Sequence, residues 1–117
     1  MTPSTPNQYS STTVSIVMNC HNGAAFLRNA LDSIIDQNFQ EWELIFWDNG
    51  STDESAKIFK SYKDKRFKYF HTPAKIKLYE ARALAVKKCT GEFLAFLDTD
   101  DEWYTDNLSQ QLASFDT

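Results

Sequence analysis

Three carboxylates crowd one short stretch near the end of the chain. Asp98, Asp100 and Asp101 come directly after the apolar run 93–97. Carboxylates this close repel one another, and a divalent cation would offset that repulsion. Hard oxygen ligands suit Mg²⁺ or Mn²⁺, which keep part of their coordination shell for substrate phosphates. The cluster therefore predicts a metal site, and the competing interpretation is an acidic loop that is only solvated.

Polar residues also follow two earlier apolar runs. After the run 14–18 the chain reads Asn19, Cys20, His21 and Asn22, and after the run 42–47 it reads Asp48 and Asn49. Short acid and amide side chains can bond a base edge or a ribose hydroxyl, although an Asx turn before a helix explains the second pair equally well. His21 can stack on a ligand or hydrogen-bond it, whereas a lone histidine is more often packed or solvated.

Arg82 is the candidate phosphate ligand. It lies among Ala81, Ala83 and Ala85, whose small side chains would let the guanidinium extend over a pocket. The alternative is an ordinary surface arginine. Trp103 and Tyr104 follow the acidic cluster and fit a sugar or base site or the core equally well.

The elements that position these residues alternate along the chain. β-branched and aromatic runs predict strands over 14–18, 42–47, 67–70 and 93–97, and the first, second and fourth suit strands buried on both faces. Stretches with apolar residues three and four apart lie between them and predict helices. The expected fold class is α/β, a Rossmann-like, mostly parallel sheet. Ligands bind at the carboxyl edge of such sheets, so the polar clusters should converge there.

Four helices are expected. The first follows Gly23 and turns one apolar stripe inward: Phe26, Leu27, Ala30, Leu31, Ile34 and Ile35. A capping box of Ser51 and Glu54 predicts that the second begins there and runs to about Tyr62, with Ala56, Phe59 and Tyr62 inward. The third runs from about Lys77, with Leu78, Ala81, Ala85 and Cys89 inward, to a left-handed turn at Gly91, and the fourth begins near Thr105, with Leu108, Leu112 and Phe115 inward.

Length and composition limit the function. The 117 residues suffice for one domain, and the net charge of −4 argues against a nucleic-acid partner. No apolar run is long enough for a transmembrane segment. Two cysteines, Cys20 and Cys89, are expected to be reduced thiols of a cytoplasmic protein, and residues 1–13 are expected to be a flexible lead-in without the features of a signal peptide.

Four ordered motifs carry a family resemblance. They are Val14–Asn22, Trp47–Asp53, Glu80–Arg82 and Gly91–Asp101, and together they resemble the nucleotide-binding half of family 2 glycosyltransferases, which have the GT-A fold. Residues 14–117 are then the donor-binding part of such a domain. The sequence departs from the usual pattern at Asn19–His21, at Asn49, where a second Asp is frequent, and at Ala83, where Asn is common.

The resemblance implies transfer of a sugar from a nucleotide-diphosphate sugar to a hydroxyl of an acceptor glycan or lipid-linked glycan, with inversion. It places the nucleotide sugar against ten residues: Asn19, Cys20, His21, Asn22, Asp48, Asn49, Arg82, Asp98, Thr99 and Asp100. It assigns the Mn²⁺ or Mg²⁺ to Asp100 and next to Asp101.

A complete domain of this family has about twice this length, and its second half supplies the general base. The chain is therefore expected to be a truncated domain without turnover of its own. Two other functions stay open. One is a non-catalytic α/β binding module with a solvated acidic loop, and the other is a Mg²⁺-dependent phosphoryl-transfer enzyme.

Overall fold

The computed structural model describes residues 12–115, in which four strands alternate with four helices. The elements are β1 (Val14–Cys20), α1 (Ala24–Ile35), β2 (Trp42–Asn49), α2 (Ser55–Lys60), β3 (Phe67–Thr72), α3 (Leu78–Val86), β4 (Phe93–Phe96) and α4 (Asn107–Phe115). All pairings are parallel, in the order β3-β2-β1-β4. The predicted α/β class is confirmed.

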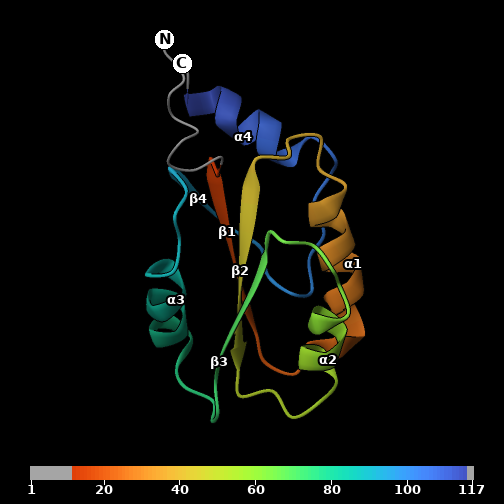
Figure 1. The fold of residues 1–117 in the computed structure, drawn as a ribbon, viewed down its shortest axis with the longest axis vertical. Helices are drawn as coiled ribbons and strands as arrows, with labels where there is room; N and C mark the ends of the chain where they lie inside the picture. Colours follow the sequence, from red (N-terminus) through yellow and green to blue (C-terminus); the bar gives the residue numbers. More distant parts are fainter. Residues whose placement is uncertain (1–11, 116–117) are drawn as a thin grey trace.

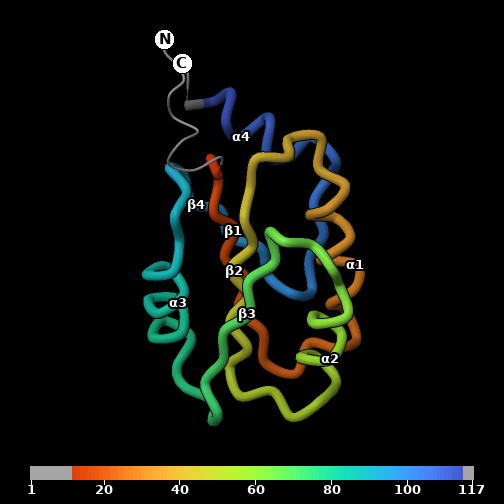
Figure 2. Tube along the Cα trace, in the orientation of Figure 1, coloured from red at the N-terminus to blue at the C-terminus, as the bar shows by residue number. Residues whose placement is uncertain are grey.

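The sheet is covered on both faces (Figure 1). Helices α1 and α2 lie on one face and α3 lies on the other, while α4 crosses the end at which the strands begin. The tube in Figure 2 shows the resulting crossovers, each strand returning through a helix to the same end of the sheet. All strands therefore end at one carboxyl edge, where the loops into α1, α2 and α3 begin.

Successive side chains of a strand point to opposite faces of the sheet, so the hydrophobic core consists of two clusters, one on each face. Ile16 and Met18 of β1 pack with α1 in the larger cluster, whereas Val17 packs with Ala81 and Ala85 of α3 on the other face. The alanines are fully buried, and their small side chains let α3 lie close to β1 and β2. The predicted inward positions Ala81, Ala85 and Leu108 are confirmed.

The prediction that the fourth strand is buried on both faces is wrong. Leu94 and Phe96 of β4 are 44% and 49% exposed, while Ala95 between them is buried. The reason is position: β4 is an edge strand, and α3 packs over β1 and β2. An apolar run looks the same in a central strand and in an edge strand. The sequence pattern therefore cannot show that α3 leaves β4 uncovered.

Two apolar residues predicted to face inward are exposed. Phe26 is 55% and Leu78 is 51% exposed. Each lies in the first turn of its helix, and both helices begin beyond the carboxyl edge, where the sheet no longer covers a side chain. The rest of the predicted α1 stripe is confirmed, since Leu27, Ala30, Leu31 and Ile34 are fully buried and Ile35 packs against them.

The predicted capping box is also wrong. Helix α2 begins at Ser55, after Glu54, without a side-chain cap bond. Ser51 Oγ instead accepts a hydrogen bond from Asn22 N at 3.0 Å. A partner from the β1–α1 loop therefore takes the hydroxyl that a local cap would have used, and tertiary contact overrides the local signal.

Gly91 is needed for a reason other than the predicted left-handed turn. Among the described glycines, the left-handed φ belongs to Gly50. At Gly91 a Cβ would lie 2.8 Å from Ser15 N, so the chain passes too close to β1 for a side chain. Gly91 N donates to Ser15 Oγ at 2.8 Å.

A buried carboxylate that the sequence did not single out joins three strands. Glu43 of β2 accepts hydrogen bonds from Ser15 Oγ and Thr90 N, both at 2.6 Å, and its other oxygen accepts from Lys68 Nζ at 2.9 Å. Burial raises the pKa of Glu43, but the bonds from Ser15, Thr90 and Lys68 outweigh it and leave this pKa below its ordinary value. A fully bonded carboxylate is stable in the sheet interior.

The expected lead-in and the expected inward position of Phe115 fall at the ends of the described region. Most of the expected lead-in, and the side chain of Phe115, lie outside the described residues. Thr13 is paired with the sheet: its N donates to Glu41 O at 2.9 Å and its O accepts from Phe93 N at 3.0 Å.

None of the helices between residues 12 and 115 has the length and apolar character to cross a membrane. Cys20 and Cys89 are both free thiols.

Candidate functional site

The polar ends of β1 and β2 lie side by side. Asn19 pairs with Trp47 and Cys20 with Asp48 in the parallel register. The strands extend two residues further than predicted, so these polar residues belong to the strands rather than to the loops after them. The expected convergence of the first two clusters is present because the strands are parallel and in register.

Asp48 is buried with both carboxylate oxygens engaged. Its Oδ1 accepts from Ser51 N at 3.0 Å and its Oδ2 accepts from the Tyr69 hydroxyl at 2.7 Å. Burial, together with the charge and hydrogen bond of Asp48, raises the pKa of Tyr69, which therefore stays a donor to that carboxylate. Asp48 thus holds the turn after β2 and bonds a side chain from the middle of β3.

Asn49 holds the loop that leads into α3. Its Nδ2 donates to Ile76 O at 2.9 Å, and its Oδ1 accepts from Ile76 N at 2.8 Å and from Thr72 Oγ1 at 3.2 Å. This use of both ends of the amide needs Asn, because a carboxylate could not donate.

Gly50 brings the same loop still closer. Its φ is +64°, and a Cβ there would lie 2.4 Å from Lys75 N. The segment 74–76 is therefore clamped against the end of β2 by Asn49 on one side and by contact with Gly50 on the other.

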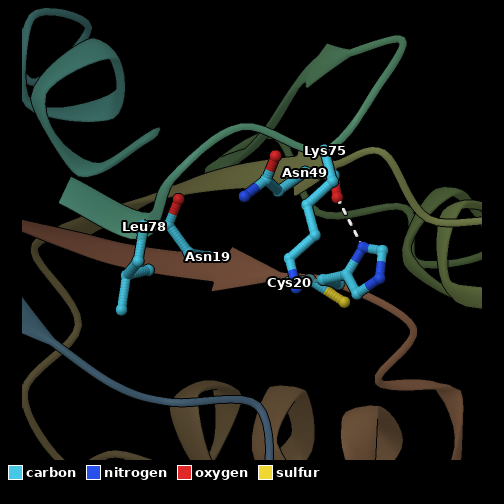
Figure 3. A pocket seen from close by; sticks show the side chains of 6 residues that line it. Asn19, Cys20, Asn49, Lys75 and Leu78 are labelled. Atoms are coloured by element: carbon cyan, nitrogen blue, oxygen red, sulfur yellow. Dashed lines mark hydrogen bonds between the residues drawn. The ribbon is translucent and has the colours of Figure 1, made fainter. Parts of the chain in front are cut away.

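His21 is oriented by the main chain of β2. Its Nδ1 lies 2.7 Å from Asn49 O, the contact drawn as a dashed line in Figure 3. A carbonyl oxygen can only accept, so Nδ1 carries the proton, and in the neutral ring Nε2 is an acceptor. The ring thus has a fixed tautomer at the edge of the site.

A pocket of about 230 Å³ opens between these residues and α3. Its walls are Asn19, Cys20, His21, Asn49, Lys75 and Leu78 (Figure 3). Four of these six were predicted site residues, and the structure brings them together. The sequence did not point to Lys75 or Leu78 as site residues, although Lys75 lies in the stretch 57–77, which is rich in lysine and precedes α3.

One wall atom lacks a partner. Asn19 Oδ1 is buried and accepts no hydrogen bond from any residue that the structure describes. Buried polar atoms are almost always paired, so this atom is an exception among the described residues. Because the atom is closed to solvent, a ligand would reach it only if the Asn19 amide moved.

Asn22 connects two loops, and Cys20 packs in the hydrophobic core. Asn22 adopts a φ of 52°, and its Oδ1 accepts from Thr52 N at 2.7 Å and from Asp53 N at 3.2 Å, which ties the β1–α1 loop to the β2–α2 loop. The Cys20 side chain is part of the larger core cluster, and burial raises the pKa of its thiol. Cys20 is therefore a neutral thiol that lines the pocket without nucleophilic character.

The acidic cluster is compact. One carboxylate oxygen each of Asp98, Asp100 and Asp101 lies within 4.8 Å of the others, and all three residues are exposed. The loop starts beside β1, because Leu97 N donates to Val17 O at 3.2 Å. Thr99 lies against the start of α1, where its Oγ1 would be 2.9 Å from a Cβ at Gly23. The three oxygens are close enough for one small divalent cation to draw together, and they are the ligands such a cation prefers.

The other expected contributors lie beside the cluster. Arg82 Nη2 is 3.9 Å from Asp98 Oδ1, and its guanidinium lies 5.7 Å from the Phe96 ring. Both side chains of the Arg82–Asp98 pair are largely exposed, so the pair is weak and the guanidinium can move to another anion.

A second, open pocket of about 420 Å³ follows along residues 100–104. Trp103 packs against the core there, whereas Tyr104 is exposed.

Comparison with known proteins gives consistent matches. The family model described as "Glycosyl transferase family 2" matches residues 15–117. An uncharacterized glycosyltransferase of Haemophilus influenzae is 39% identical over 101 residues, which is 85% of this chain and 40% of that protein. The Escherichia coli enzyme WfgD, named a UDP-Glc:alpha-D-GlcNAc-diphosphoundecaprenol beta-1,3-glucosyltransferase, is 31% identical over 86% of this chain and 40% of its own length.

Solved structures give the same picture. Residues 1–349 of S. aureus TarS superpose with a TM-score of 0.84 and 27% identity, over 90% of this chain and 32% of that one. TarS has also been solved with UDP and with UDP-GlcNAc. The chain thus spans about 40% of the length of the curated relatives described above.

Proposed function

Because the chain belongs to glycosyl transferase family 2, we propose that it forms the part of a glycosyltransferase that binds a nucleotide-diphosphate sugar together with a divalent cation. The sugar passes to a hydroxyl of a glycan or a lipid-linked glycan, with inversion at the anomeric carbon. The donor is a uridine diphosphate sugar, because UDP-GlcNAc is bound by TarS and UDP-Glc is named for WfgD.

The observation that carries the proposal is the shared edge. The pocket at the ends of β1 and β2 and the cluster after β4 both lie at the carboxyl ends of adjacent strands. Open parallel sheets bind their ligands at that edge. A nucleotide with its base in the pocket and its phosphates towards the carboxylates would occupy both features at once.

Each site residue has a role in that arrangement. Asn19, Cys20, His21 and Asn49 line the base pocket, while Asp48 and Asn22 hold the surrounding turns. Asp98 and Thr99 border the ribose, Asp100 and next Asp101 are the metal ligands, and Arg82 turns from Asp98 towards phosphate oxygens. The Mn²⁺ or Mg²⁺ that this set would hold supplies positive charge where the diphosphate leaving group gains negative charge.

Calorimetric titration of the 117-residue chain tests the function. UDP, GDP, dTDP and ADP are each titrated with and without Mn²⁺, and we expect Mn²⁺-dependent binding that favours UDP. Asp100→Ala should weaken the Mn²⁺-dependent part at least about tenfold, because losing one of few charged ligands costs an ion most of its affinity. Glu92→Ala removes the same charge at the opposite end of β4 and should leave binding unchanged. Binding of none of the four nucleotides would favour the non-catalytic module instead.

A further inference from the structure

We propose that the exposed edge of β3 binds an extended, acidic segment of a partner protein, which adds to the sheet as a further strand. Main-chain hydrogen bonds hold this segment along β3, and lysines on both faces of the sheet bind its carboxylates. The edge of β3 lies across the sheet from β4 and its acidic cluster. The proposal is therefore independent of the nucleotide site.

β3 is an edge strand with no strand on its outer side. The sheet order is β3-β2-β1-β4, and β3 crosses in front of β2 in Figures 1 and 2, with α3 to one side and α2 to the other. An unpaired edge presents a row of main-chain N–H and C=O groups on which an extended peptide can pair. The edge of β3 therefore offers the main-chain groups that a further strand needs.

The hydrogen bonds to β2 show which main-chain groups of β3 point outward. Thr72 O accepts from Gly50 N at 3.1 Å, so Thr72 turns its main chain towards β2. Residues that bond one neighbour alternate along a parallel strand, and Tyr69 and His71 therefore turn their N–H and C=O groups away from β2. No loop among residues 12–115 bonds these outward groups.

Charge is sorted along the chain, and β3 lies within its basic part. Eleven of the twelve lysines and arginines fall in the stretch 57–88, together with only two acidic residues, Asp64 and Glu80. This stretch includes β3, α3 and most of α2. A chain whose net charge is −4 thus has a strongly basic segment around one edge of its sheet.

Two lysines flank β3 on opposite faces of the sheet. Lys60 Nζ lies 4.3 Å from the centre of the Tyr69 ring, and Lys88 Nζ lies 5.3 Å from the centre of the Phe70 ring. Adjacent residues of a strand point to opposite faces, so the two ammonium groups lie on either side of the edge. Neither forms an ion pair with a carboxylate of the described residues, and both are exposed. Both charges are therefore available to an anionic ligand.

Other occupants match this surface less well. A second copy of the chain would bring two lysine-rich edges together, and like charges on paired strands destabilise the pair. An anionic lipid surface would attract the lysines but has no main-chain groups to pair with the strand. In the described part of the chain, none of the exposed large apolar side chains belongs to α2, β3 or the loop between them, so nothing there would enter a bilayer. An extended acidic segment satisfies both the strand edge and its charge.

The two lysines also specify the sequence of the partner segment. Successive side chains of a strand beside β3 would point alternately to the Lys88 face and to the Lys60 face. Adjacent acidic residues therefore match both lysines, whereas strict alternation of acidic and apolar residues would match one. β3 has six residues, which sets the length of segment that it can pair.

The experiment uses the 117-residue chain and a fluorescent peptide, about eight residues long, that repeats two glutamates and two valines. Fluorescence anisotropy measures the affinity, and hydrogen exchange detected by NMR measures the protection of individual amides. Bound peptide should slow exchange at Tyr69 and His71, whose N–H groups point outward. The same peptide with methylated main-chain nitrogens keeps its charges but cannot pair, and should bind at least about tenfold more weakly.

Three charge variants test the lysines. Lys60→Glu and Lys88→Glu should each weaken peptide binding about three- to tenfold, because each replaces an attraction by a repulsion. The matched control is Lys77→Glu, which should change the affinity less than about twofold. Lys77 is likewise exposed and near an aromatic ring, 5.9 Å from that of Tyr79, but it lies at the other end of α3.

His71→Pro tests the strand edge itself. Proline removes an outward N–H and is tolerated on the solvent side of edge strands, so the variant should fold and bind the peptide at least about fivefold more weakly. Circular dichroism and thermal melts check the fold of every variant. If His71→Pro does not fold, the methylated peptide still tests main-chain pairing on the unaltered chain.

Each outcome supports or overturns the proposal. Slower exchange at Tyr69 and His71, with weak binding of the methylated peptide, supports it. Equal affinities for the two peptides, or protection confined to other residues, would show attraction by charge alone and overturn it.

Vesicles of phosphatidylglycerol and phosphatidylcholine form a parallel arm of the experiment. Vesicle binding that Lys60→Glu and Lys88→Glu abolish, without peptide binding, would overturn the proposal in favour of a lipid surface. Binding of neither peptide nor vesicles would also overturn it, and would leave the lysines the role of keeping the edge from pairing.

Discussion

The side chain of Asn49 pairs with the main chain of Ile76 as one strand residue pairs with its neighbour. Nδ2 donates to Ile76 O at 2.9 Å, and Oδ1 accepts from Ile76 N at 2.8 Å. The last residue of β2 thereby holds the loop that carries Lys75 over the pocket. The position of the loop that lines the pocket therefore depends in part on the Asn49 amide.

Asn49→Asp tests this dependence. A carboxylate keeps the bond from Ile76 N but places an acceptor against Ile76 O, so we expect the free energy of unfolding to fall by about 1–3 kcal/mol. Amide exchange at Ile76 should accelerate. Urea denaturation and hydrogen exchange measure the two effects, and Asn29→Asp makes the same chemical change at an exposed position of α1. Equal stabilities for both variants would show that the Ile76 pair contributes nothing.

Gly50→Ala should destabilise the chain more than backbone strain alone predicts. A left-handed φ costs a non-glycine residue roughly 1–2 kcal/mol, and here a Cβ would also meet Lys75 N at 2.4 Å. Asn tolerates the left-handed region, so Gly50→Asn separates the two causes. We expect both variants to lower the melting temperature by similar amounts. A nearly unchanged Gly50→Asn variant would mean that the loop moves away freely.

Glu43→Gln should lower stability and flatten its dependence on acid pH. The folded pKa of Glu43 lies below its ordinary value, so its contribution is present above pH 4.5 and is lost as the pH falls through the folded pKa. At neutral pH, loss of the charged bonds to Ser15, Thr90 and Lys68 should cost about 2–4 kcal/mol.

The measurement is denaturation at a series of pH values between about 3 and 7, compared between the variant and the unaltered chain. The difference between the two should shrink as the pH falls through the folded pKa of Glu43, because the carboxyl then becomes protonated in both the folded and the unfolded state. Glu41→Gln is the control at an exposed neighbour. A difference that stays constant over the series would show that the charge of Glu43 does not contribute.

Tyr62 gives a matching prediction at alkaline pH. Burial and the hydrogen bond to Asp32 Oδ1, 2.8 Å long, raise the pKa of Tyr62 to about 12. This folded pKa lies above the unfolded value near 10. The contribution of Tyr62 to the free energy of unfolding is therefore complete below pH 10 and is lost as the pH rises towards 12.

Ultraviolet absorbance of tyrosinate measures the titration. Tyr62→Phe should remove one late-titrating tyrosine, and Asp32→Asn should bring the titration of Tyr62 to lower pH. Asp36→Asn changes an exposed carboxylate beyond the end of α1 and should leave the titration curve as it is. An unchanged curve in Asp32→Asn would contradict the role of the hydrogen bond.

The sequence by itself determined the α/β class and the approximate place of every element, because periodicity is a local property. Strand positions such as Ile16 and helix positions such as Leu31 and Ala81 are inward as their spacing predicts. Parallel strands must end at one edge, so the grouping of Asn19, Cys20, His21 and Asn49 also followed from the order of elements. The motifs were sufficient for the family, which the matching model confirms.

Only the tertiary structure decided which partner each polar group takes. Ser51 bonds Asn22 rather than capping α2, and Asn49 bonds Ile76, because groups distant in sequence compete for the same atoms. The exposure of Phe96 depends on where α3 packs, and the need for Gly91 depends on its distance from Ser15. Lys75 joined the pocket for the same physical reason: side-chain spacing reports local geometry, whereas a binding site is made by contacts between segments that the sequence keeps apart.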